Sequence, residues 1–268
     1  MDKSNNSHLV LIGAISGDII GSAYERASVK NPDFKLFTSR SRFTDDTVCS
    51  IAVADSLISG VSFSAKMQYW CRKYPYAGYG GQFRRWITSE KPMPYNSWGN
   101  GSAMRVSPVG AYANSIEEVL ELAKESAEIT HNHTEGIKGA QATALAIFLA
   151  LHGLSKSGIK NEIETRFGYD LSRNYYDIQR TYKFDVSCQG SVPEAIIAFL
   201  TASDYESTIR LAVALGGDAD TQGAIAGGIA AAYYGDIPDH IMKESEARLP
   251  SDIKQIICEF DNFLNNGR

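Results

Sequence analysis

The sequence predicts an all-α fold, formed as one compact domain over residues 1–268. Segments rich in Ala, Ile and Leu recur along the chain without the alternation that is typical of strands. Residues that favour helix ends flank several of these segments. The chain is also long enough to bury one large core. We therefore expect helices at residues 46–59, 116–129, 136–152, 192–202, 205–215 and 221–234.

The first apolar segment carries glycine at every fourth position, at Gly13, Gly17 and Gly21. On a helix this spacing places the glycines on one stripe, where a neighbouring helix can approach closely. A dinucleotide fingerprint has the pattern GxGxxG after a strand, so a Rossmann interpretation is weak. Helical geometry also puts Asp18 and Glu25 on nearly the same face. Asp18 is a candidate buried structural acid, and Glu25 is a candidate metal ligand.

Local signals mark the ends of the later helices. Ser115 precedes an acidic first turn and is a typical N-cap. Pro193 and Pro238 indicate helix openings with proline in the first turn. Glycines at 60, 153 and 235 lie where helix C-termini are expected. Two segments look irregular, Tyr74–Ser107 and Lys156–Gly190, and either could hold binding loops or ordinary surface loops.

Composition excludes several classes of protein. The net charge of -5 and the absence of a Lys/Arg-rich block argue against nucleic-acid binding. Four cysteines are scattered without a CxxC pair, which favours free thiols in a reducing compartment. The sequence shows neither a signal peptide nor an apolar run of the roughly twenty residues that a membrane span needs. We expect a cytoplasmic protein without membrane contact.

Two acidic clusters, Thr44-Asp45-Asp46-Thr47 and Asp218-Ala219-Asp220-Thr221, each open into an apolar run. For either cluster alone, a simple helix N-cap is a good explanation. Gly216-Gly217 before the second cluster is unusual for a mere cap and indicates tightly packed backbone. So much negative charge beside a core segment is costly unless a cation compensates it. If the clusters meet in space, they form a metal centre.

The charge of the candidate ligands favours a pair of divalent ions. Five carboxylates would contribute about five negative charges, which two divalent ions nearly balance and one does not. Carboxylate and hydroxyl oxygens suit Mg²⁺ or Mn²⁺, whereas zinc would be expected to recruit His or Cys. The five residues are Glu25, Asp45, Asp46, Asp218 and Asp220.

Two further motifs could contact a ligand. One candidate diphosphate cradle combines small residues with an arginine, in the segment Asn100-Gly101-Ser102-Ala103-Met104-Arg105. His131 and His133 lie two residues apart, so we expect a loop or helix end there. Each histidine could bind a polar ligand or cap the preceding helix. A nucleophile-elbow GxSxG motif is absent.

Taken in order, these motifs resemble the ADP-ribosylglycohydrolase family, which includes ADP-ribosyl-arginine and ADP-ribosyl-serine hydrolases. The resemblance runs from about Gly13 to Gly235, and the paired Asp motifs together are its specific part. The matching motifs are GDxxGxxxE at 17–25, TDDT at 44–47, GNGSAMR at 99–105, TH at 130–131 and GGDADT at 216–221.

The resemblance implies a compact all-α fold with two Mg²⁺ or Mn²⁺ ions at the base of a cleft. It places one ion at Thr44, Asp45, Asp46 and Asp220, and the other at Glu25, Asp218, Asp220 and Thr221. The implied substrate contacts are Asn100, Gly101, Ser102, Met104 and His131, with Gly80 at the rim.

The implied function is hydrolysis of the glycosidic bond between ADP-ribose and an acceptor, with Glu25 or Asp46 as the proton acceptor. The acceptor belongs to an ADP-ribosylated protein, through a side chain such as arginine, or to a small ADP-ribose conjugate. Two alternatives remain from the residues alone. Two metals and a diphosphate cradle also suit a nucleotide diphosphatase, and the same fold could serve a non-catalytic ADP-ribose-binding protein.

Overall fold

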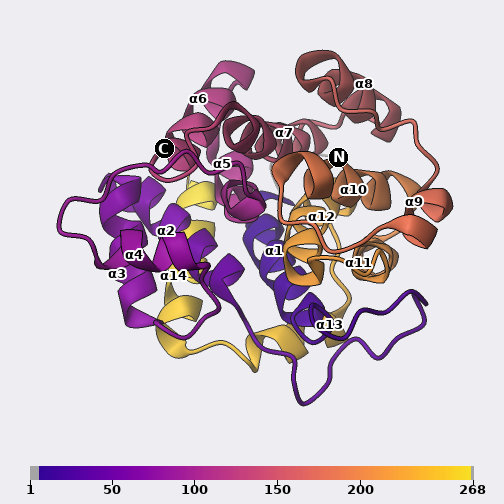
Figure 1. Cartoon of the computed structure of the whole chain (residues 1–268), viewed down its shortest axis with the longest axis horizontal. Coiled ribbons are helices and arrows are strands. Elements are labelled where there is room, and N and C mark those ends of the chain that lie inside the picture. The colour runs from indigo at the N-terminus through magenta and orange to yellow at the C-terminus, as the bar shows by residue number, and fades with distance from the viewer. Residues whose placement is uncertain (1–5, 267–268) are drawn as a thin grey trace.

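The computed structural model describes residues 6–266, which form fourteen α-helices and one short 3-10 helix but no strand (Figure 1). The all-α prediction is therefore confirmed. The helices are α1 (Ser7–Gly21), α2 (Asp45–Ser59), α3 (Phe63–Lys73), α4 (Gly81–Thr88), η2 (Asn100–Ser102), α5 (Ser107–Tyr112), α6 (Ile116–Glu128), α7 (Thr134–Leu151), α8 (Lys156–Phe167), α9 (Tyr175–Thr181), α10 (Cys188–Thr201), α11 (Tyr205–Ala214), α12 (Ala219–Tyr234), α13 (Asp239–Glu246) and α14 (Ser251–Asn266).

Helices α1 and α12 cross at the centre of the molecule with their backbones in contact (Figure 1). A Cβ atom built on Gly17 would lie 2.0 Å from the carbonyl oxygen of Gly223, and one on Gly21 would lie 2.2 Å from that of Ala219. No side chain fits in these gaps, because real Cβ atoms do not approach so closely. The predicted glycine stripe is thus the surface on which α12 packs.

One continuous hydrophobic core surrounds this helix pair. Residues of α1 and α12 are buried over nearly their whole lengths, as expected for helices that are apolar on all sides. The buried cluster also takes side chains from α2, α7 and α10. The outer helices α3, α6, α13 and α14 each bury one face only. An outer layer of amphipathic helices therefore surrounds the apolar central helices.

Most predicted helix ends are confirmed. Ser115 accepts a hydrogen bond from the Glu118 N–H at the start of α6. Gly60 and Gly235 have φ values of 68° and 65°, the left-handed conformation that ends α2 and α12. Gly153, with φ of 83°, lies one residue beyond the C-cap of α7.

Two predictions about local structure are wrong. Lys156–Gly190 is not irregular, because it contains α8, α9 and the first turn of α10. Tyr74–Ser107, in contrast, is irregular for most of its length as predicted, and contains only α4 and η2 before α5 begins. Pro193 does not open a helix: α10 starts five residues earlier, at Cys188, after Ser187 has capped the N–H of Gly190.

Within residues 6–266, no helix combines the length and the apolar character that crossing a membrane requires. The four cysteines are free thiols, three of them buried.

The α1–α12 contact should tolerate no side chain at Gly17. We expect Gly17→Ala to lower the free energy of unfolding by about 3 kcal/mol, because the new methyl meets backbone. Gly228→Ala is the matched control, since a Cβ there meets only side-chain atoms at 3.3 Å and beyond. It should cost less than about 1 kcal/mol. Urea denaturation of both variants measures the difference, and equal losses would contradict the backbone contact.

Asp261 on α14 should make stability depend on pH. Burial raises its pKa to about 7, and its Oδ1 is buried without a hydrogen-bond partner. The folded-state pKa is above the unfolded value, so stability is full at low pH and is lost as pH rises toward 7. We expect Asp261→Asn to raise the melting temperature relative to wild type at pH 8 but hardly at pH 4. A difference independent of pH would refute this assignment.

Candidate metal centre and adjoining cavity

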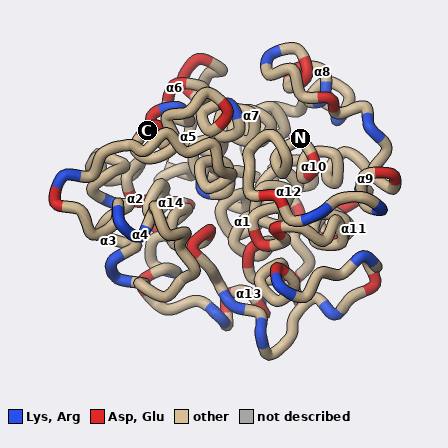
Figure 2. Tube along the Cα trace, viewed as in Figure 1, with Lys and Arg blue, Asp and Glu red and all other residues tan. Residues whose placement is uncertain are grey.

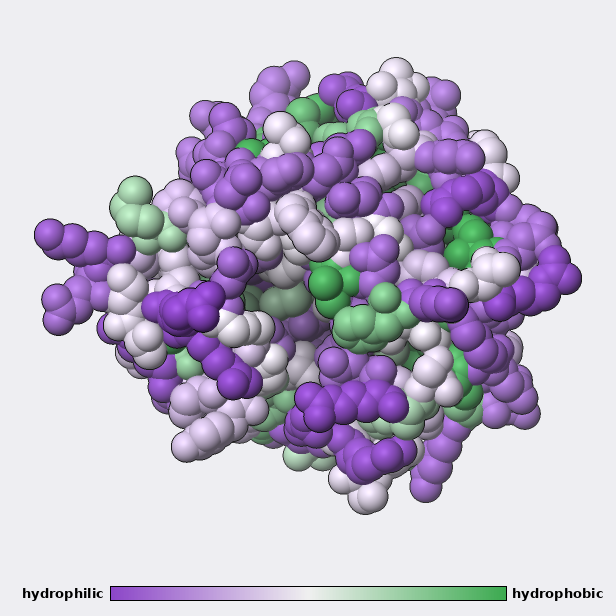
Figure 3. Space-filling view, in the orientation of Figure 1, coloured by the Kyte–Doolittle hydropathy of each residue, from purple (hydrophilic) through white to green (hydrophobic). Residues whose placement is uncertain are grey.

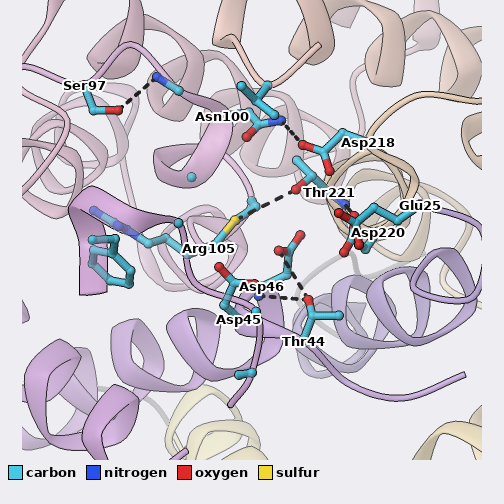
Figure 4. Close-up of a pocket in the computed structure, with 18 of the residues that line it drawn as sticks. Glu25, Thr44, Asp45, Asp46, Ser97, Asn100, Arg105, Asp218, Asp220 and Thr221 are labelled. Carbon is cyan, nitrogen blue, oxygen red and sulfur yellow. Dashed lines mark hydrogen bonds between the residues drawn. The ribbon is translucent and has the colours of Figure 1, made fainter. Parts of the chain in front are cut away.

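Two helix N-termini, those of α2 and α12, bring the acidic clusters together (Figure 4). Asp45 and Asp46 occupy the first turn of α2, while Asp218 is the N-cap of α12 and Asp220 lies in its first turn. The positive ends of two helix dipoles therefore face this region and partly offset its negative charge. Figure 2 shows Asp and Glu segments at the centre of the view, around the α1 label.

Asp18 is the buried structural acid that the sequence suggested. It is fully buried and accepts hydrogen bonds from the backbone N–H groups of Thr44 and Thr47 at 2.9 and 3.2 Å. Both threonine hydroxyls also donate to it. Burial raises its pKa to about 6, although these hydrogen bonds oppose the shift. Asp18 thus fixes the start of α2 onto α1 and sets the direction of the acids that follow.

The first cluster is held on both sides. Thr44 Oγ1 accepts from the Asp46 N–H at 3.2 Å, which is the predicted N-cap. Asp45 donates its N–H to the carbonyl of Ala77 at 2.9 Å. A Cβ on Gly78, whose φ is +124°, would lie 2.9 Å from Asp45 Oδ1, so this turn packs directly against the carboxylate. Asp46 is buried, and its Oδ2 has no hydrogen-bond partner.

The second cluster meets Glu25. One carboxylate oxygen from each of Glu25, Asp218 and Asp220 lies within 4.8 Å of the others (Figure 4). Glu25 is not on the α1 helix face that the spacing predicted, because α1 ends at Gly21. A turn in which the Glu25 N–H donates to the Gly21 carbonyl carries it to the cluster instead. Asp218 accepts from Asn100 Nδ2 at 2.7 Å.

Burial, and to a smaller extent neighbouring charges, raise the pKa values of four aspartates at the centre. Burial is the largest cause for Asp45, whose pKa is about 7, and the charges of Asp18, Asp218 and Glu25 add to it. The pKa values of Asp46 and Asp220 are raised well above the usual range by burial and then by neighbouring aspartates. The pKa of Asp218 is raised by burial as well.

Within residues 6–266, no ion pair includes any of these carboxylates. Burying a carboxylate without a cationic partner costs free energy. Asp46 Oδ2, which has no hydrogen-bond partner, is an oxygen still free to bind a cation. The donor set consists of carboxylate and threonine oxygens, which match hard divalent cations. The chemistry of the residues therefore fits a Mg²⁺ or Mn²⁺ centre.

A cavity of about 460 Å³ adjoins the acidic region. Figure 3 shows this face hollowed near its centre, with apolar side chains at one side of the opening. The turn at Gly78–Gly81 forms one wall and the segment from Gly99 to Arg105 another. Most of the predicted site residues line the cavity, namely Glu25, Thr44, Asp45, Asp46, Gly80, Asn100, Gly101, Met104, His131, Asp218, Asp220 and Thr221.

Two residues of the 99–105 segment are placed differently from the expected cradle. Asn100 directs its amide at Asp218 and at Ser191 Oγ, so it supports the second cluster from behind. Ser102 is fully buried, does not line the cavity and donates its hydroxyl to the Gly136 carbonyl at 2.7 Å. Only Gly101, Met104 and Arg105 of the segment follow Asn100 along the cavity wall.

The two histidines separate in role. His131 is buried at the cavity, and a Cβ on Gly101 would lie 3.0 Å from its Nε2. Its pKa is lowered well below the usual value by burial and by the charge of Arg105. His133 caps the following helix, α7, because its Nδ1 accepts from the Glu135 N–H at 3.1 Å. The suggestion that it caps the preceding helix is wrong.

Sequence reasoning missed several cavity residues. Phe184 and Val186 lie at the opening with 55% and 45% of their surfaces exposed. They come from the segment that was expected to be irregular, where two apolar residues alternate with charged ones. Arg26 and Arg42 line the cavity beside the acids. Arg26 directly follows Glu25, and Arg42 lies two residues before Thr44, so the available signal was closeness in sequence to a predicted motif.

Comparisons with known proteins identify one family. A family model described as ADP-ribosylglycohydrolase matches residues 4–263. ADP-ribosylhydrolase ARH3 of Gallus gallus is 26% identical over 339 residues, covering 93% of this chain and 92% of the relative. ADP-ribosylarginine hydrolase Tri1 of Pseudomonas putida (strain GB-1) is 23% identical over 270 residues, covering 84% of this chain and 69% of the relative.

A solved structure described as an ADP-ribosylglycohydrolase-related protein complex has the same fold, with a TM-score of 0.72 and 24% identity. The match covers 97% of this chain and 99% of the other. Because the family model spans nearly every residue that the structure describes, the chain belongs to the ADP-ribosylglycohydrolase family.

Proposed function

We propose that this protein hydrolyses the glycosidic bond between ADP-ribose and an acceptor, using two Mg²⁺ or Mn²⁺ ions. One observation carries the proposal: unpaired, buried carboxylates from two helix N-termini converge on one side of a 460 Å³ cavity. The similar proteins are named as ADP-ribosylhydrolases, which supports this class of substrate. The proposed substrate is an ADP-ribosylated protein, through a side chain such as arginine, or a small ADP-ribose conjugate, in the cytoplasm.

The proposed ligand groups follow the geometry of the two clusters. Thr44, Asp45 and Asp46 would hold one ion, and Glu25, Asp218 and Thr221 the other, with Asp220 shared between them. Asp18 would take no part in binding, because its oxygens already accept from Thr44 and Thr47. Two such ions would supply electrostatic stabilisation of developing negative charge and activation of water.

The chain's own residues would orient the substrate and move the proton. Gly101 and His131 both line the cavity and would contact the nucleotide part of the substrate, so that the distal ribose would lie over the acids. A carboxylate near the anomeric carbon would take the proton of the attacking water. Asp46, whose Oδ2 lacks a partner, and Glu25 are the two candidates.

Removing a carboxylate of the centre should abolish activity. We expect Asp46→Ala or Asp220→Ala to reduce ADP-ribose release by more than about 100-fold, since even outer partners of metal ligands are worth 10- to 100-fold. Asp239→Ala is the control, because Asp239 also lies in the first turn of a helix but its side chain is 94% exposed. Chromatography of the products measures release, and unchanged turnover in either site variant contradicts the proposed centre.

The same assay separates the alternative reactions. Free ADP-ribose identifies glycosidic hydrolysis, whereas AMP identifies cleavage of the diphosphate. Binding of ADP-ribose without any turnover in either metal would instead identify a non-catalytic binding protein. A panel of substrates with arginine, serine and acetyl linkages then identifies the acceptor.

Metal binding should stabilise the fold at this centre. We expect Mg²⁺ or Mn²⁺ at 100 times its dissociation constant to add about 2.7 kcal/mol to the free energy of unfolding. Asp220→Asn should lose most of this gain, because Asp220 contributes to both groups of ligands. Thermal unfolding with and without each metal measures the shift. An equal shift in wild type and Asp220→Asn places the metal elsewhere.

A further inference from the structure

Arg105 is a buried cation with no carboxylate partner among the described residues. It is 1% exposed, and its Nη2 donates to the Ser126 carbonyl at 2.6 Å and to Thr130 Oγ1 at 3.0 Å. Figure 4 shows its side chain running along the cavity wall, away from Asp218 and Asp220. A charge held only by neutral oxygens is costly to bury, so its placement calls for a function.

Thr130 connects this cation to His131. Thr130 Oγ1 lies 2.7 Å from His131 Nδ1, and the hydroxyl is fully buried. A guanidinium has donors only, so Arg105 must donate in its contact with Thr130. Within the described residues, His131 Nδ1 is then the acceptor within reach of the hydroxyl proton. The opposite arrangement, with Nδ1–H donating to Thr130, would leave a buried hydroxyl proton without an acceptor.

The neighbours of His131 therefore decide which nitrogen of its imidazole carries the proton. Burial and the Arg105 charge lower its pKa, so the ring carries one proton at neutral pH. If Nδ1 accepts from Thr130, that proton resides on Nε2. This nitrogen lies beside Gly101, where a Cβ would come within 3.0 Å of it, and both residues line the cavity.

We propose that Arg105 and Thr130 act as positioning residues that hold His131 as a neutral imidazole protonated on Nε2. The hydrogen bonds Arg105 Nη2–H to Thr130 Oγ1, and Thr130 Oγ1–H to His131 Nδ1, run in one direction. The end of this chain is a fixed N–H donor at the cavity wall. Such a donor recognises an anionic or carbonyl oxygen and rejects a cation.

The ligand part of the inference rests on the proposed function, in which the diphosphate of ADP-ribose lies against this wall. The tautomer itself does not depend on any ligand. It can be measured in the ligand-free protein by ¹⁵N NMR of histidine-labelled samples, with the His131 signals identified through their loss in His131→Gln.

Wild type should show Nε2–H at His131, and so should Thr130→Ser, which keeps the hydroxyl. Thr130→Val has nearly the same shape but neither donates nor accepts, so we expect Nδ1–H to become populated. Arg105→Lys should retain Nε2–H, because an ammonium group also has donors only. Nδ1–H in wild type or in Arg105→Lys, or an unchanged tautomer in Thr130→Val, would overturn the proposal.

Calorimetry with ADP-ribose as the probe adds the functional consequence. Thr130→Val should bind about tenfold more weakly than wild type, as expected for a weakened hydrogen bond to a charged group, and Thr130→Ser should bind nearly as well as wild type. Equal affinity in wild type and Thr130→Val would remove His131 from ligand recognition. If ADP-ribose does not bind wild type at all, the proposed function is contradicted. The tautomer of His131 is still tested independently by NMR.

Discussion

The contact between the α1 and α12 backbones is the constraint on which the candidate site depends. Glycines at 13, 17 and 21 on α1, and at 223 and 227 on α12, bring each backbone against the other's carbonyl oxygens. Asp220, in the first turn of α12, therefore lies beside the end of α1 and within reach of Glu25. A single methyl added to one of these glycines would push α12, with Asp218 and Asp220, away from α1 and Glu25. The close glycine packing of α1 against α12 therefore keeps the carboxylates of Glu25, Asp218 and Asp220 close together.

Asp18 shows how the fold accommodates one buried acid and leaves others unsatisfied. It accepts hydrogen bonds from both threonines of the first cluster, and these interactions offset part of its desolvation. Asp46, two residues after Thr44, has an oxygen with no partner, and its pKa is raised well above the usual range by burial and nearby carboxylates. The contrast separates a carboxylate that joins two helices from one that is left open to a ligand. Asp18 therefore serves the stability of the fold, whereas Asp46 has an oxygen free to bind a ligand.

The sequence predicted features that are decided within a few residues, such as helix ends, and missed features that depend on tertiary contacts. Thr44, Ser115 and Gly235 were correctly placed at helix ends, because capping is decided within a few residues. Helix α8 was missed since it buries only Ile159 and Ile163 and so lacks a strong apolar period. The acidic clusters could be proposed because each is contiguous in sequence. The direction of Asn100, Ser102 and Thr130 could not, because each is set by partners far along the chain or by a helix end.

Arg105 is held apart from the acids that line the same cavity. Arg105 is buried in the cavity wall, yet its guanidinium is held by Ser126 and Thr130 rather than by a carboxylate. Paired with Asp46 or Asp220, that cation would lower the pKa of the acid and occupy its oxygens. Held apart, it leaves the carboxylates available to divalent ions and adds positive charge on another part of the wall. Under the proposed function, a ligand that spans both regions would offer oxygens to the metal ions at one end and acceptors to N–H donors at the other, as a ribose joined to a diphosphate does.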